Sequence, residues 1–129
     1  MKVTRRTANV VLVILAGVFA LGVAVSVFAA KHIPSGFSGG DGRSREHAVI
    51  IRYAGDYELS VEREYDYISS IFGARDKDWA FIGQRITQSN GKFYDEVTIK
   101  MTFSREIFTI YFDITEPYTA LQRHLTNND

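Results

Sequence analysis

The sequence contains no cysteine. This absence excludes disulfides, thiol catalysis, thiolate metal sites and the acceptor cysteine that carries the lipid in bacterial lipoproteins. Acidic residues are missing before Asp41, whereas three of the 15 basic residues, Lys2, Arg5 and Arg6, lie in the first six positions. The rest of the chain contains 12 basic and 15 acidic residues and therefore has a net charge of −3. A mildly acidic domain without a basic stripe lacks the attraction for phosphate backbones, so nucleic acid is not an expected partner.

An uncharged apolar segment, residues 7–30, follows the basic residues 1–6. A helix of about 20 residues already crosses a hydrocarbon core of about 30 Å, whereas the apolar part of a signal peptide usually has about 7–15 residues. The length therefore favours a transmembrane helix that stays in the membrane. Because positive flanks collect on the cytoplasmic side, we expect residues 1–6 in the cytoplasm and the rest of the chain outside.

The end of the apolar segment also fits a signal sequence. Val27-Phe28-Ala29 followed by Ala30 places small residues at the spacing that a signal peptidase reads. Cleavage after Ala29 would release the same domain as a secreted or periplasmic protein. The sequence leaves both outcomes open, and both place the domain outside the cytoplasm.

The rest of the chain divides into three parts by composition. Residues 31–45, which include IPSGFSGGDGRS, are rich in Gly and Ser and are predicted to be a flexible linker. Residues 46–117 carry the periodic patterns of one folded domain. Residues 118–129 follow Pro117 and are predicted to be a polar tail in which order fades.

The patterns in the domain predict one helix and four strands. The helix is expected between Asp56, a favourable N-cap, and Gly73, which can close a helix in the left-handed conformation. Its apolar face, with helical spacing, contains Val61, Tyr65, Ile68 and Phe72. Strand-like runs cover residues 48–53, 79–88, 93–102 and 107–115.

Asn90-Gly91 predicts a tight hairpin, because both central positions of a type I′ turn need positive φ. The implied register places Arg85 opposite Glu96, and Ile82 opposite Ile99. The chain is therefore predicted to be an α+β domain of order β-α-β-β-β after the N-terminal transmembrane helix. In it, one helix packs on an antiparallel sheet, on the face that holds Ile82, Val97, Ile99 and Phe112.

The element order resembles a cystatin-like α+β roll, although no inhibitor motif accompanies it. The strings GKFYDEVTIKMTFSREIFTIYFDIT and GDGRSREHAVII also resemble a group of small, uncharacterised bacterial envelope proteins that are membrane-anchored or secreted. The resemblance covers residues 40–115, and it implies an envelope location but no particular activity.

The sheet face opposite the helix is the candidate binding surface. Aromatic and arginine side chains are common in protein-binding patches, although an ordinary solvated sheet face would also carry such residues. We expect this face to meet another envelope protein, and the oligomeric state is left open. The candidate residues are Arg85, Tyr94, Lys100, Tyr111 and Asp113.

Catalysis is the less favoured alternative. Asp95 and Asp113 each lie inside a strand, and two adjacent carboxylates can perform acid-base chemistry. The predicted register, however, places Asp95 opposite Ile86 on the helix-facing side, whereas Asp113 points the other way. No motif for a nucleophile, a phosphate or a metal is present, and the histidines lack metal-ligand spacing. We therefore expect no enzyme activity, no cofactor and no metal.

Overall fold

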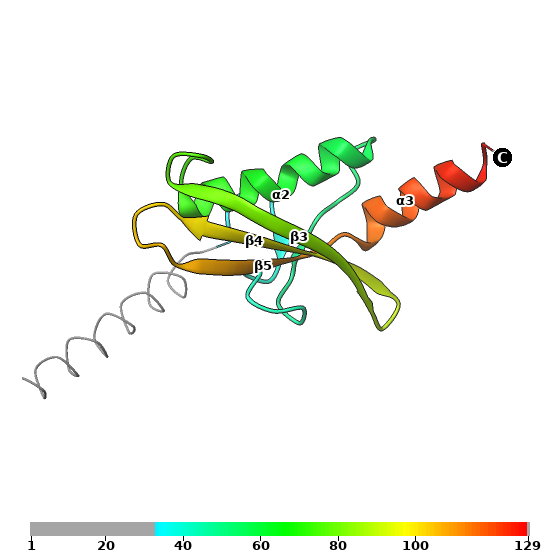
Figure 1. The fold of residues 1–129 in the computed structure, drawn as a ribbon. Helices are drawn as coiled ribbons and strands as arrows, with labels where there is room; N and C mark the ends of the chain where they lie inside the picture. Colours follow the sequence, from blue (N-terminus) through cyan, green and yellow to red (C-terminus); the bar gives the residue numbers. More distant parts are fainter. Residues whose placement is uncertain (1–32, 129) are drawn as a thin grey trace, which may run out of the picture. The chain divides into compact units, whose positions relative to one another are not determined.

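A computed structural model describes residues 33–128, which form a mixed sheet and two helices (Figure 1). The strands are β1 (Ser38–Gly39), β2 (Val49–Ile50), β3 (Trp79–Ser89), β4 (Lys92–Met101) and β5 (Ile107–Asp113). The helices are α2 (Tyr57–Phe72) and α3 (Thr115–Thr126). The sheet order is β1-β2-β5-β4-β3, and α2 lies across one face of the sheet.

The predicted membrane segment, residues 7–30, lies outside the described residues, as do its flank and the proposed cleavage site after Ala29. Within residues 33–128, neither helix has the length and apolar character that crossing a bilayer requires.

Helix α2 begins and ends where its capping residues require. Asp56 Oδ1 accepts a hydrogen bond from the Glu58 amide at 2.6 Å, and Gly73 closes the helix with a φ of 99°. The predicted bounds are confirmed. The most buried side chains are Ser60, Glu64, Tyr67 and Ile68. The buried face is therefore rotated from the predicted one and includes a carboxyl group.

The β3–β4 hairpin confirms the predicted register from its turn as far as Gly83 opposite Thr98. Both turn residues, Asn90 and Gly91, have positive φ as predicted. Beyond Gly83 a β-bulge adds one residue to β3, so that Phe81, not Ile82, pairs with Ile99. Ile82 is consequently 53% exposed, and its predicted place in the core was wrong.

The sheet is not purely antiparallel, because β2 pairs in parallel with β5, with Val49 opposite Phe112. Strand β1 then pairs with β2, although residues 31–45 were predicted to be a flexible linker. Glycine makes this pairing possible: a Cβ added at Gly40 would lie 2.2 Å from the carbonyl oxygen of His47. The glycine-rich composition here serves close backbone packing instead of flexibility.

Helix α3 includes residues 118–126, which were predicted to belong to a polar tail. Pro117 was interpreted as the point where order fades, but it lies in the first turn of α3 and is buried. Amides in the first turn of a helix have no intrahelical partner, so the missing N–H of a proline costs nothing there. The prediction failed because proline both ends and begins helices.

The core lies between α2 and the sheet. Tyr67 packs edge-on against both Phe37 and Phe112, with ring centroids 5.2 and 5.8 Å apart. Trp79 is fully buried, and its Nε1 donates a hydrogen bond to the Gly73 carbonyl at 2.7 Å. Tyr67 also donates to the carbonyl of Asp41 at 3.1 Å, so the glycine-rich segment is fixed to the core.

Replacing Gly40 with Ala should destabilise the domain, because the new methyl group would collide with the backbone at His47. We expect the free energy of unfolding to fall by about 2 kcal/mol, as measured by denaturant unfolding of the full chain. Gly83→Ala is the matched control, since a Cβ there meets no atom within 4 Å. Equal stability of the two variants would contradict the close pairing of β1 with β2.

Candidate functional site

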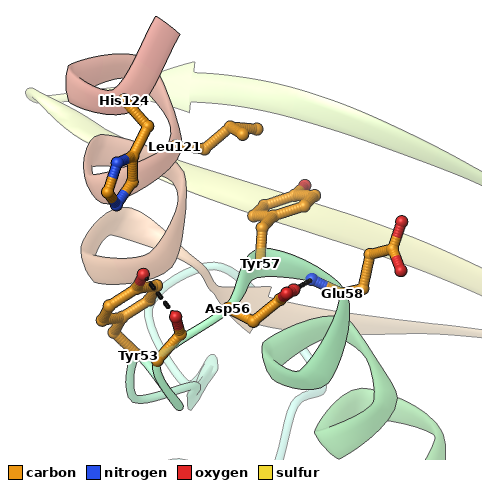
Figure 2. Close-up of a pocket in the computed structure, with 7 residues that line it drawn as sticks. Tyr53, Asp56, Tyr57, Glu58, Leu121 and His124 are labelled. Carbon is orange, nitrogen blue, oxygen red and sulfur yellow. Dashed lines mark hydrogen bonds between the residues drawn. The ribbon is translucent and has the colours of Figure 1, made fainter. Parts of the chain in front are cut away.

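A groove of about 450 Å³ opens between the beginning of α2 and the second half of α3 (Figure 2). Such a volume falls within the range of small-ligand sites. The segment before α2 and the first turn of α2 form one wall, and α3 forms the other. The lining residues are Tyr53, Gly55, Asp56, Tyr57, Glu58, Leu121 and His124.

Local hydrogen bonds and ring contacts hold the groove in shape. The Tyr53 hydroxyl donates to the Gly55 carbonyl at 2.8 Å, which fixes the turn before α2. The ring of Tyr118 on α3 lies 6.4 Å from that of Tyr57 and 4.6 Å from that of Phe93 on β4. The aromatic contacts therefore join α2, α3 and β4 beside the groove.

The groove combines carboxylates with aromatic rings. Asp56 uses one carboxylate oxygen to cap α2, whereas the Glu58 side chain is exposed (Figure 2). Leu121 and His124 are three residues apart on α3 and share one face of it. Carboxylates beside tyrosine rings favour a cationic group, through charge and through cation–π attraction.

A buried pair of carboxyl groups lies between α2 and the sheet. Glu64 and Asp95 are both 0% exposed. If both groups are ionised, none of their four carboxyl oxygens has a hydrogen-bond donor among residues 33–128. Burial raises the pKa of Glu64 to about 9, with the charge of Asp95 and a hydrogen bond to it as further causes. At this pKa Glu64 keeps its proton at neutral pH, and its hydroxyl donates a hydrogen bond to the Asp95 carboxylate.

The pKa of Asp95 is also raised, chiefly by burial. The hydrogen bond from Glu64 opposes this effect, and the charge of Glu96 adds to it. Tyr57 connects the carboxyl pair to the groove: burial raises the pKa of its phenol to about 12, and the charges of Asp95 and Glu64 contribute. Tyr57 thus lines the groove, and its phenol lies near enough to the carboxyl pair for their charges to raise its pKa.

The opposite face of the sheet carries an ion cluster instead of an open surface. Glu96 is buried, and its carboxylate accepts hydrogen bonds from Arg85 at 2.5 Å and from Arg45 at 2.6 Å. Burial acts to raise the pKa of Glu96, but hydrogen bonds from Arg85, Arg45 and Thr87 outweigh it and leave the pKa lowered. Arg45 precedes β2 and reaches across β5 to make this contact.

The predicted binding surface is only partly present. The structure confirms the Arg85–Glu96 pair, and Lys100 and Tyr111 are half-buried. Tyr94 is only 8% exposed between Thr87 and Asp113 on the neighbouring strands, so the expected open tyrosine face is absent from the described domain. The Arg45 side chain crosses part of this face to reach Glu96.

The two aspartates considered for catalysis lie apart, as their register predicted. Asp113 is bound by Thr115, whose hydroxyl donates to Oδ1 at 2.6 Å, and by Lys92 at 3.3 Å. Asp95 meets Glu64 instead, a partner that the sequence analysis missed. The signal was available: Tyr57, Ser60, Glu64 and Tyr67 recur at steps of three and four.

No protein family matches the chain, and neither the curated proteins nor the solved structures contain a match. Within residues 33–128, no group of three or more His, Asp or Glu side chains is placed to hold a metal ion.

Stability should fall as the pH rises from about 4.5 to about 9. The unfolded chain releases the Glu64 proton near the ordinary pKa of 4.5, whereas the folded domain holds it up to about 9. Folding must therefore bind a proton across this window, which costs free energy at high pH. Glu64→Gln keeps a donor for Asp95 but cannot ionise. We expect it to raise the free energy of unfolding at pH 8 by about 4–5 kcal/mol and to change it little at pH 4.5.

Denaturant unfolding of the full chain between pH 4.5 and 9 measures this difference. Asp66→Asn is the matched control, because Asp66 is an exposed carboxylate on the same helix. The free energy of unfolding of this variant should change with pH in the same way as that of the original protein. If the free energy of unfolding of Glu64→Gln also followed the pH dependence of the original protein, Glu64 would be shown to ionise normally in the folded domain.

Proposed function

We propose that this protein is an extracytoplasmic binding domain, held at the membrane by residues 7–30, whose groove binds a cationic group. The proposal rests on the lining of the groove, where Asp56 and Glu58 lie beside two tyrosine rings in a cavity of about 450 Å³. The simplest occupant is a lysine or arginine side chain of another envelope protein. The basic flank, residues 1–6, supports an orientation with the domain outside.

The placement of the acidic groups supports binding over catalysis. A general acid or base must come within hydrogen-bond reach of its substrate. The Glu64 and Asp95 side chains are fully buried, and Asp113 is engaged by Thr115 and Lys92. Asp56 in the groove already caps α2. The two carboxylates that line the groove, those of Asp56 and Glu58, therefore contribute negative charge at its rim.

Removing the two rim charges should weaken the binding of cations. In the variant Asp56→Asn/Glu58→Gln, asparagine preserves the helix cap, so the fold should persist. We expect agmatine, which carries an amine and a guanidinium, to bind the full chain in neutral detergent micelles, and we expect the variant to bind it about tenfold more weakly.

Backbone amide NMR shifts at Tyr57 and Leu121 measure this binding. Glu62→Gln is the matched control, because Glu62 is an exposed carboxylate of α2 that does not line the groove. It should bind agmatine as tightly as the original protein. Equal affinity of the double variant would refute the rim carboxylates as the cation site.

The membrane tether makes a separate prediction. After expression in a bacterial host, the intact mature protein should remain in the membrane fraction with a mass that includes residues 7–30, because that segment is long enough to span. A soluble protein that begins at Ala30 would instead identify residues 27–29 as a cleavage signal. The domain would then be secreted or periplasmic, and its groove would act on diffusible ligands.

A further inference from the structure

A second cavity of about 400 Å³ is lined by β2 and the two residues after it, by the start of β4, by the end of β5 and by α3. Arg52 lines this cavity, and its neighbour Tyr53 lines the groove. Ile50 and Ile51 form its apolar part, and α3 supplies Thr119 and, one turn further along, Arg123. The two cavities therefore share α3 as a wall but have different charged linings.

The carboxylates of the second cavity already have donors. Asp113 Oδ1 accepts from the amide and the hydroxyl of Thr115, at 3.1 and 2.6 Å, and Oδ2 lies 3.3 Å from Lys92 Nζ. Glu116 accepts from the Tyr53 amide at 3.4 Å and from Arg52 Nη1 at 3.3 Å. Both acids are thus hydrogen-bonded within the domain.

The cations, by contrast, keep unused donors. An arginine offers five N–H groups and a lysine three, but within the described part of the chain Arg52 and Lys92 each make a single contact to a carboxylate. The guanidinium of Arg123 forms no ion pair among residues 33–128. The cavity therefore has one more cation than it has acids and a clear surplus of N–H donors.

We propose that this cavity binds an anionic group of the phosphate or carboxylate class between Arg52, Lys92 and Arg123. Arginine binds such planar or tetrahedral oxyanions through paired N–H donors, and lysine binds them as a point charge. The Thr119 hydroxyl adds a donor on the same side of α3. The isoleucines reduce solvent screening on one side of the ligand. The source is either a free anion or the headgroup of an acidic lipid near the tethered domain.

The test uses inorganic phosphate as the probe and the full chain in zwitterionic phosphatidylcholine nanodiscs. We expect saturable NMR shifts at Thr119 and Arg123, and we expect Arg123→Gln to weaken phosphate binding about tenfold. Arg123 is exposed, so this variant should fold normally. Lys77→Gln, at an exposed lysine that does not line the cavity, should bind phosphate unchanged. Shifts that do not saturate, or an unaltered affinity in Arg123→Gln, would overturn the proposal.

A second arm distinguishes the two sources of anion. In nanodiscs that contain phosphatidylglycerol, a lipid headgroup that occupies the cavity would produce the Thr119 and Arg123 shifts without added phosphate and would compete with phosphate. A site for a free anion would bind phosphate with the same affinity in both kinds of nanodisc. This experiment leaves the groove carboxylates intact, so its result is independent of the cation site.

Discussion

Strand β4 pairs on both of its edges, with β3 and with β5, and this double pairing decides the surroundings of two adjacent acids. Because successive side chains point to opposite faces, Asp95 faces α2 whereas Glu96 faces Arg45 and Arg85. A slip of one residue would bring Glu96 into the apolar core and remove Asp95 from Glu64. The Asn90-Gly91 turn fixes the register, so a two-residue loop at one end of the sheet governs both acidic centres.

The domain accommodates these two buried acids by opposite means. Glu96 remains charged because two guanidinium groups and a hydroxyl donate to it. Asp95 has no cation beside it among residues 33–128, and its partner is a second carboxyl group that retains a proton. Leaving a charge buried without a partner costs several kcal/mol, and a shared proton avoids much of that cost. Added salt should therefore have little influence on the Glu64–Asp95 pair, because neither group reaches solvent.

Local signals in the sequence predicted the hairpin and the helix, because the residues that determine them are adjacent in the chain. Asn90-Gly91 sets the turn, and Asp56 with Gly73 delimits α2. The missed features depend on contacts between distant segments. The parallel pairing of β2 with β5, the bulge at Ile82 and the crossing of Arg45 over the sheet have no local pattern. The candidate site was missed for the same reason, since its two walls are more than 60 residues apart.

Helix α3 is a wall of both cavities, and its ring contacts with the rest of the domain pass through Tyr118, which meets Tyr57 and Phe93. A ligand that displaces α3 in one cavity must therefore alter the shape of the other. Thermodynamic linkage makes such an effect reciprocal: whatever factor the first ligand applies to the affinity of the second, the second applies to the first. The position of α3 thus sets the shape of two cavities whose linings carry unlike charge.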